Sequence, residues 1–261
     1  MSELSINTTQ NVKINFIAAT PGERMGAYFI DLGIKISYVI VVLLIVFSWL
    51  NLGQALDSLN GVKVWVMEGR FHFYEGYTME EVTFPVRVMK FLGVNKLMVS
   101  NASGGVNAAY KVGSIVIIKD HINFTPEHPL RGKNDERFGP RFVNMSEPYS
   151  RKMIIKAKEI ASRLNIEIHD GIYFGLQGPT FETLAEYKMV KILGADCVGM
   201  STVPEVIVAR HMDVETFGIS VITDMGNEES IDTISHDEVL EAAKMAEPKV
   251  RALIKNLILE Y

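Results

Sequence analysis

The stretch "GADCVGMSTVPEVIVARH", residues 194–211, decides the fold class. Its segment "DCVGM" (196–200) has the apolar character of a short strand. Thr202 and Glu205 follow three residues apart, which is the spacing of a capping box that opens a helix. A strand that passes through a short polar loop into a helix is the repeating unit of α/β proteins. The stretch therefore predicts an α/β fold.

The same alternation continues on both sides of this stretch. Further strands are expected at 62–68, 95–100, 114–120, 166–174 and 217–223. Strands that alternate with helices form a mainly parallel sheet with helices on both faces. We therefore expect a single-domain α/β fold over residues 61–261, with a mainly parallel twisted sheet flanked by helices, after an atypical N-terminal segment at residues 1–60.

Capping boxes and apolar periodicity mark the helices between these strands. Helices are expected from Thr78, with Glu81 in the box position, to about Leu92, up to about Leu164, from Glu182, and from Ser235, with Glu238 in the box position. Pro248 should kink or restart the last helix. Residues 127–142 form a long polar loop rich in Gly and Pro, and loops of that length in compact domains are usually functional or disordered.

The composition excludes several classes of function. A net charge of −5, with scattered Lys and Arg, leaves no basic face for nucleic acid, so a small-molecule partner is expected. The single cysteine, Cys197, excludes an internal disulfide framework and a multi-cysteine metal site. This cysteine usage fits a reducing compartment, and we expect a cytoplasmic protein.

One apolar run argues against a cytoplasmic location. The stretch "YVIVVLLIVFSWL", residues 38–50, is apolar nearly throughout, and its extension over residues 34–52 approaches the length of a membrane span. A buried strand pair or a core helix explains the same run, because β-branched residues also fill central parallel strands. Attachment to a membrane is the less favoured reading and stays open.

Polar or glycine-rich loops follow five of the expected strands. Because ligands bind at the carboxyl ends of parallel strands, these loops should meet at one edge of the sheet. Their sequences are "GRFHFYEGY", "SNASGG", "GPTFET", "GMST" and "TDMGNEES". The sequence therefore predicts a pocket built from most of the chain.

The residue types in these loops suit three parts of one ligand. Arg70, the loop "NASGG" and Ser201 beside a helix start could each hold phosphate. An aromatic ring next to a carboxylate, Phe181 and Glu182, could stack on a heterocycle and accept its ring N–H groups, with Met200 nearby. Polar side chains that could reach a sugar are His72, Tyr74 and His236. Phosphate, sugar and heterocycle together describe the phosphorolysis of a nucleoside.

From about Val62 to its end the chain resembles the trimeric purine nucleoside phosphorylases. The resemblance rests on the stretches "GRFHFYEGY", "EVTFPVRVMK", "SNASGGVN", "DHINF", "PLRGKNDERFGPRF", "GPTFET", "GADCVGMSTVPEVIVARH" and "SHDEVL". It implies one α/β domain in a homotrimer, inorganic phosphate as the second substrate, and neither a metal nor a cofactor.

The resemblance also implies a role for each matching residue. Phosphate would be contacted by Arg70, Ala102 and Ser201. His72, Tyr74 and Met200 would line phosphate and ribose, and His236 would bind the ribose 5′-hydroxyl. Phe181 and Glu182 would stack on the base and orient it, while Phe142 would close the site of a neighbouring subunit.

The sequence departs from the family in two places. Asp224 stands where many members carry Asn as the partner of purine N7 and the 6-substituent, and an ionised carboxylate would favour the 6-amino group of adenine. Residues 1–60 contain neither the "GSGLG"-type loop nor the "EGH"-type turn that supply a serine and a histidine to phosphate. A frameshifted or mis-joined N-terminus would explain this. The alternative functions are a methylthioadenosine-type phosphorylase and an inactive nucleoside-binding relative, either free or attached to a membrane.

Overall fold

The computed structural model describes residues 3–7, 13–17, 62–67, 69–226 and 236–261. Their contacts separate two units, Met1–Asp57 and Ser58–Tyr261. In the first unit, β1 (Glu3–Asn7) pairs antiparallel with β2 (Lys13–Ile17). The predicted division at residue 60 and the apolar run at 38–50 fall outside these ranges, so the division stays a prediction.

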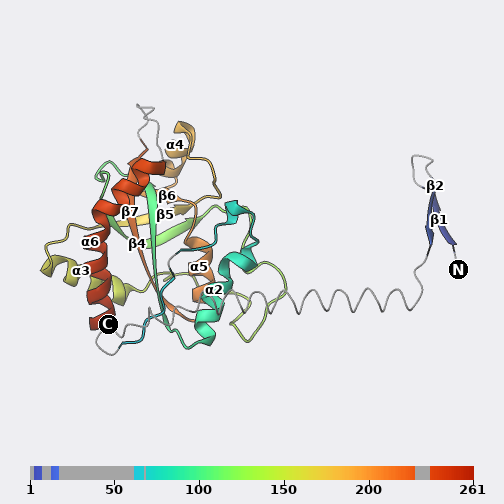
Figure 1. The fold of residues 1–261 in the computed structure, drawn as a ribbon, viewed down its shortest axis with the longest axis horizontal. Helices are drawn as coiled ribbons and strands as arrows, with labels where there is room; N and C mark the ends of the chain where they lie inside the picture. Colours follow the sequence, from blue (N-terminus) through green and yellow to red (C-terminus); the bar gives the residue numbers. More distant parts are fainter. Residues whose placement is uncertain (1–2, 8–12, 18–61, 68, 227–235) are drawn as a thin grey trace. The chain divides into compact units, whose positions relative to one another are not determined.

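The second unit is built around five strands that close into a barrel (Figure 1). The pairs β3/β7, β4/β5 and β5/β6 are parallel, whereas β3/β6 and β4/β7 are antiparallel. The mainly parallel α/β fold is therefore confirmed, whereas the closure of the sheet into a barrel was not predicted. The strands are β3 (Lys96–Gly105), β4 (Ile115–Asn123), β5 (His169–Gly175), β6 (Cys197–Gly199) and β7 (Glu215–Met225).

Helices cover the outside of this barrel in two pairs (Figure 1). Helix α2 (Met79–Phe91) packs on α5 (Val203–His211), and α3 (Arg151–Arg163) packs on α6 (His236–Glu260). A further helix, α4 (Leu184–Ile192), follows the loop after β5, and a 3-10 turn, η2, spans Phe73–Glu75. In the described part of the chain, no helix is long and apolar enough to cross a membrane.

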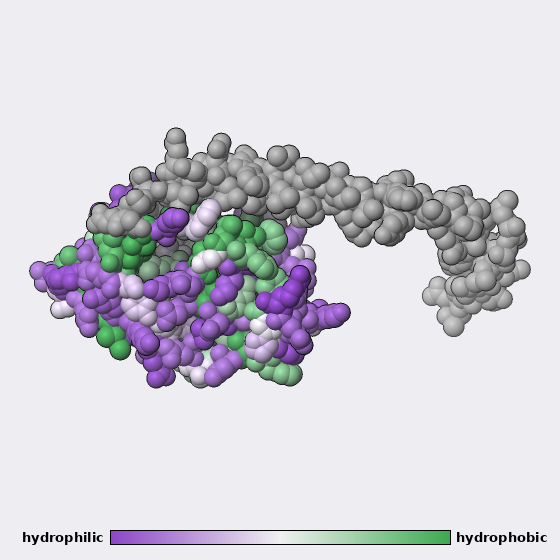
Figure 2. All heavy atoms as spheres, turned by 90° about the horizontal axis from the view of Figure 1, so that it is seen from below, coloured by the Kyte–Doolittle hydropathy of each residue, from purple (hydrophilic) through white to green (hydrophobic). Residues whose placement is uncertain are grey.

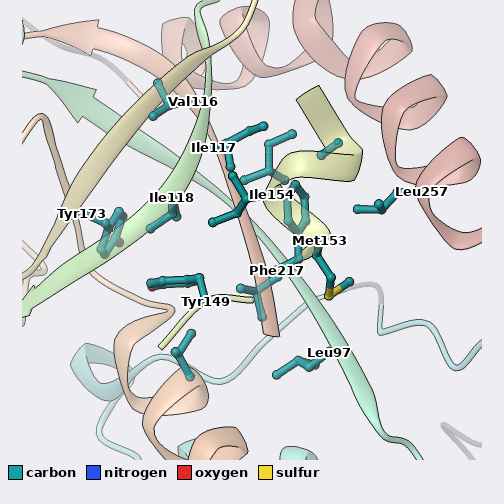
Figure 3. Packing of buried hydrophobic residues seen from close by; sticks show 14 of the residues in the cluster. Leu97, Val116, Ile117, Ile118, Tyr149, Met153, Ile154, Tyr173, Phe217 and Leu257 are labelled. Atoms are coloured by element: carbon teal, nitrogen blue, oxygen red, sulfur yellow. The ribbon is translucent and has the colours of Figure 1, made fainter. Parts of the chain in front are cut away.

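The main core lies between the strands and the helices α3, α5 and α6 (Figure 3). The run Ile115–Ile118 in β4 is at most 2% exposed, because a strand covered on both sides buries consecutive residues rather than every second one. Large side chains from several elements complete the cluster, among them Tyr149, Met153, Tyr173, Phe217 and Leu257.

The expected strand at 62–68 is wrong. Val62 forms an isolated bridge, and residues 63–67 have no regular secondary structure. Val66 is 46% exposed. A β-branched segment becomes a strand only where a neighbour offers backbone partners. Because β3 and β7 pair and close the barrel, no free edge is left for this segment.

Other boundaries differ less. Strand β3 continues through Gly105, so the expected loop at "NASGG" is strand. Helix α4 begins at Leu184, two residues after the expected start, because Thr183 rather than an earlier residue caps it. Helix α6 runs through Pro248 as one element and does not restart there. Residues 127–142 form a loop without helix or strand, as expected.

Candidate active site

A strained turn at Thr202 joins β6 to α5. Thr202 is fully buried and has φ 70° and ψ −51°, and the N–H of Val203 donates to the carbonyl of Ser201 at 2.7 Å. This γ-turn is rare for a β-branched residue and persists only where its surroundings hold it. The Asn101 amide donates to Thr202 Oγ1 at 2.8 Å, and Glu205 accepts from the Thr202 N–H at 3.1 Å. The turn places Ser201 at the N-terminus of α5.

Arg70 reaches this helix start from the segment before η2. Its Nη1 donates to Ser201 Oγ at 3.0 Å, and its Nε lies 3.2 Å from Glu205 Oε2. Both side chains of the Arg70–Glu205 ion pair are mostly buried. Glu205 therefore holds the guanidinium against Ser201, beside backbone N–H groups that suit an anion. Arg70 and Ser201 are 131 residues apart in sequence, and the fold brings them together as expected.

His72 and Tyr74 lie next to this pair. Their rings stack with centroids 4.7 Å apart and an angle of 17° between the planes. Burial and the charge of Arg70 lower the pKa of His72, against the opposing effects of Glu75 and Glu205. His72 is therefore mainly neutral at pH 7, with one ring nitrogen as donor and the other as acceptor.

A small cavity lies beside His72 and Ser201. Its volume of about 10 Å³ is at the lower limit for holding one water molecule. The lining includes His72, Thr125, Met200, Ser201 and Glu205. The cavity thus joins residues expected at phosphate to residues expected at ribose.

The loop "QGPT" packs against the same group through Gly178. A Cβ on Gly178 would lie 2.3 Å from Met200 Sδ and 3.2 Å from Tyr74 Cδ1, and its φ of 71° also favours glycine. This close approach brings Tyr74 and Met200 together and sets the start of the segment that carries Phe181 and Glu182. Phe181 itself is 43% exposed.

The two carboxyl groups expected at the base share a third partner, Tyr187. The Tyr187 hydroxyl donates to Asp224 Oδ2 at 3.1 Å and interacts with Glu182. Burial raises the pKa of Asp224, while hydrogen bonds from Thr223 and Tyr187 oppose the shift. Burial and the neighbouring Asp224 raise the pKa of Glu182. Both carboxyl groups are therefore easier to protonate than exposed ones, and they contact the same hydroxyl.

Three other expected residues, Ala102, Phe142 and His236, have no described contact that tests their expected roles. Ala102 is an exposed residue of β3, opposite Val221 in β7. Phe142 is 89% exposed in the long loop and does not pack into this chain's own site. His236 is the first residue of α6, and its side chain lies outside the described part.

Sequence reasoning missed three residues that shape the site. Glu205 was recognised as a helix cap, but its second role as the partner of Arg70 depends on a distant segment. Asn101, which holds the Thr202 turn, and Tyr187, which contacts both carboxyl groups, have no local signal at all. Among the described residues, no cluster of His, Cys, Asp and Glu could hold a metal ion.

Comparison with known proteins shows the family to which this chain is related. The model of the phosphorylase superfamily matches residues 55–259. Purine nucleoside phosphorylase 1 of Bacillus subtilis is 48% identical over 206 residues, which cover 79% of this chain and 76% of the relative. The purine nucleoside phosphorylase of Bos taurus is 50% identical over 207 residues, which cover 77% and 72%.

Solved structures agree with this match. A Schistosoma purine nucleoside phosphorylase in complex with hypoxanthine has a TM-score of 0.73 and 40% identity, covering 76% of this chain and 73% of that one. The Schistosoma mansoni enzyme has also been solved with adenosine, at 40% identity and TM-score 0.73 with coverage of 76% and 74%. This chain belongs to the phosphorylase superfamily and, within it, to the purine nucleoside phosphorylases.

Proposed function

We propose that this chain cleaves purine ribonucleosides and deoxyribonucleosides with inorganic phosphate, giving the free base and ribose or deoxyribose 1-phosphate. The contact of Arg70 with Ser201 at the N-terminus of α5 carries the proposal. It supplies a cationic fork, a hydroxyl and backbone donors at one point, which is the set of groups that a phosphate dianion requires. Ala102 would add a backbone contact from β3.

The reaction transfers the glycosyl group between two nucleophiles. The bond from C1′ to the purine nitrogen breaks with its electron pair leaving on the base, and a phosphate oxygen forms the new bond to C1′ from the opposite face. His72, Tyr74 and Met200 would hold the ribose between the two, and His236 would bind its 5′-hydroxyl. The enzyme's task is to position the phosphate and to stabilise the charge that develops on the departing purine.

Glu182 and Asp224 would handle the base, with Phe181 stacked on its ring. A carboxylate at Glu182 suits the N1–H of hypoxanthine or guanine, whereas a carboxylate at Asp224 suits the 6-amino group of adenine. The geometry therefore supports acceptance of both 6-oxo and 6-amino purines. Inorganic phosphate is the only co-substrate required, without a metal or cofactor.

A homotrimer in the cytoplasm is the proposed working form. Phe142 is 89% exposed, Ile192 73% and Phe91 70%, so three large apolar side chains lie mostly in water in the single chain. Hydrophobic patches also interrupt the hydrophilic surface on the face drawn in Figure 2. Burial of such side chains against a second copy would remove them from water, and it would place Phe142 at a neighbour's site.

A methylthioadenosine-type phosphorylase is the nearest alternative, favoured by Asp224. The two activities differ in the group at the ribose 5′ position. The resemblance of "SHDEVL" to the family's 5′-hydroxyl partner favours adenosine over its 5′-methylthio analogue as substrate. The inactive alternative rests on residues 1–60, most of which lie outside the described part of the chain.

The deciding experiment measures base release from inosine, guanosine, adenosine and 5′-methylthioadenosine by the full-length chain, with and without phosphate. We expect release that requires phosphate and is weakest with the methylthio nucleoside. Omission of phosphate is the matched control for contaminating hydrolases. A folded chain that binds nucleosides without phosphate-dependent release would support the inactive alternative instead.

A further inference from the structure

Tyr187 lies on α4, and its side chain packs against the barrel. It is 4% exposed, and its ring packs in a cluster with Phe174, Val190 and Val198. A Cβ on Gly226 would lie 2.2 Å from the Tyr187 ring, so only a glycine fits there. The ring is therefore fixed, and its hydroxyl has a fixed direction.

That hydroxyl points at the two carboxyl groups expected to bind the base. It donates to Asp224 Oδ2 at 3.1 Å and interacts with Glu182. The backbone of β3 closes the other side, since a Cβ on Gly104 would lie 2.8 Å from Asp224 Oδ2 and 3.3 Å from the Tyr187 oxygen. Asp224 and Tyr187 are thus in direct contact in a space without room for a further side chain.

The number of protons in this cluster follows from its surroundings. Burial raises the pKa of Glu182 and of Asp224, and Asp224 and Glu186 raise that of Glu182 further. Burial and both carboxylates raise the pKa of the Tyr187 phenol, so the phenol stays neutral. The Tyr187 hydroxyl is the common partner of both carboxyl groups, and two like charges held this close repel each other, so we infer that the pair carries one shared proton when a base is bound.

We propose that Tyr187 is a positioning residue that lets this shared proton reside on either Glu182 or Asp224. The transfer is balanced: protonated Glu182 gives its proton to the Tyr187 oxygen while the Tyr187 O–H proton passes to the Asp224 carboxylate. Tyr187 is neutral before and after, and one carboxylate remains ionised throughout. The inference rests on the proposed function, which places these carboxyl groups at the base.

The two proton positions match the two kinds of purine. Adenine has an acceptor at N1 and a donor at its 6-amino group, so it matches protonated Glu182 and ionised Asp224. Hypoxanthine has a donor at N1 and an acceptor at its 6-oxo group, so it matches ionised Glu182 and protonated Asp224. Both patterns contain one proton. One site would therefore accept both bases at the same pH.

The test measures equilibrium binding of adenine and of hypoxanthine over a range of pH by calorimetry, using the full-length chain. In the unmodified protein we expect the two affinities to follow one bell-shaped pH profile, because both complexes need the same number of protons. Tyr187→Phe keeps the ring and removes the hydroxyl that stabilises the one-proton form. In this variant the pH range over which each base binds should become narrower at both its acidic and its basic end. The affinity for each base should fall by about threefold to tenfold.

Two further variants make the test decisive. Tyr110→Phe is the matched control, because Tyr110 is 6% exposed and donates to the Asp170 carbonyl at 2.8 Å in another part of the barrel. It should leave both profiles unchanged. In Asp224→Asn only Glu182 can hold the proton, so adenine affinity should fall with rising pH while hypoxanthine affinity rises.

The outcomes separate the inference from the proposed function. Opposite slopes for the two bases in the unmodified protein, an unchanged width in a folded Tyr187→Phe variant, or parallel slopes in Asp224→Asn would each overturn the shared proton. So would failure to bind either base. The expected binding profiles without phosphate-dependent base release would support the shared proton and overturn the proposed function.

Discussion

Asp224 is the residue at which the choice of base should be decided. An asparagine amide can donate to purine N7 and to a 6-oxo group, whereas an ionised carboxylate only accepts. We therefore expect Asp224→Asn to lower kcat/KM for adenosine relative to inosine by about tenfold, the size of one mismatched hydrogen bond to a polar partner. Steady-state phosphorolysis of both nucleosides by the two proteins measures this ratio, and an unchanged ratio would remove Asp224 from base recognition.

His121 should make the stability of the fold depend on pH. It lies in β4 with Nδ1 3.2 Å from the Tyr149 hydroxyl, and burial lowers its pKa to about 4, against the opposing charge of Asp120. In the unfolded chain His121 becomes protonated near the ordinary histidine pKa. In the folded chain it becomes protonated only at about pH 4. The folded state should thus lose about 3 kcal/mol of stability between these two pKa values as pH falls.

His121→Asn tests this, because asparagine keeps a polar contact for Tyr149 without titrating. The free energy of unfolding of both proteins is measured with denaturant at pH 7 and at pH 4.5. The difference between the two proteins at each pH cancels the contribution of the carboxyl groups. We expect the free energy of unfolding to fall more steeply toward acid in the unmodified protein. Parallel pH dependences would show that His121 is not the group responsible.

Single residues could be predicted where a loop sequence carries the chemistry. Arg70 and Ser201 were chosen as anion-binding types in strand-end loops, and the fold brings them within 3.0 Å. Tyr187 could not be chosen, because it looks like any aromatic residue on the apolar face of a short helix. Its role depends on glycines at 104 and 226 in other elements, which leave the space for its ring and for Asp224.

At the scale of elements, the capping box at the start of α2 supports a specific stability prediction. Glu81 N–H donates to Thr78 Oγ1 at 3.2 Å, and Glu81 Oε2 accepts from the Thr78 N–H at 2.8 Å. Thr78→Ala removes an acceptor that the helix N-terminus needs, so the free energy of unfolding should fall by about 1 kcal/mol. Thr78→Ser, which keeps the hydroxyl, is the control. Equal losses in both variants, measured by denaturant unfolding, would assign the effect to packing.

Elements were predictable where local chemistry determines them. The boxes at Thr78 and Thr202 were found in sequence and are confirmed, with Glu81 and Glu205 as partners. The second half of β3 was not, because small polar residues are typical of turns. They stand in a strand here because Ser103 hydrogen-bonds Ser220 of the parallel neighbour β7 at 2.6 Å. A partner 117 residues away leaves no local trace in the sequence.

The closed barrel belongs to the scale of the whole molecule. Alternation of strands and helices predicted parallel pairing, but closure depends on β7, which pairs parallel with β3 and antiparallel with β4. The antiparallel contact covers only Ile115–Ile118, and the sequence of that run suits either direction. Closure determines the edge of the sheet at which the loops meet. It also leaves no free strand edge for residues 62–67, which therefore form a connection that leads to Arg70.

Assembly with other copies should complete the site. Phe142 is too exposed to act in the site of its own chain. We therefore expect it to act in the site of a neighbouring chain, so that a neighbour with an intact Phe142 compensates for its loss. Phe142→Ala should raise the KM for nucleoside about tenfold, as expected for the loss of one buried aromatic contact. Arg70→Ala should abolish phosphate use. Mixed oligomers of the two variants then contain sites with Arg70 from one chain and Phe142 from its neighbour.

Such mixtures should therefore contain a fraction of sites with the low KM of the unmodified protein, which Phe142→Ala alone lacks and which the inactive Arg70→Ala alone cannot supply. The matched control mixes Arg70→Ala with Ser201→Ala: because these two residues touch within one chain, every site keeps one defect and no activity should return. Assays on co-refolded pairs, with size-exclusion chromatography to confirm mixing, compare the two cases. Mixed oligomers that gain nothing from a neighbour's Phe142 would show that each site is complete within a single chain.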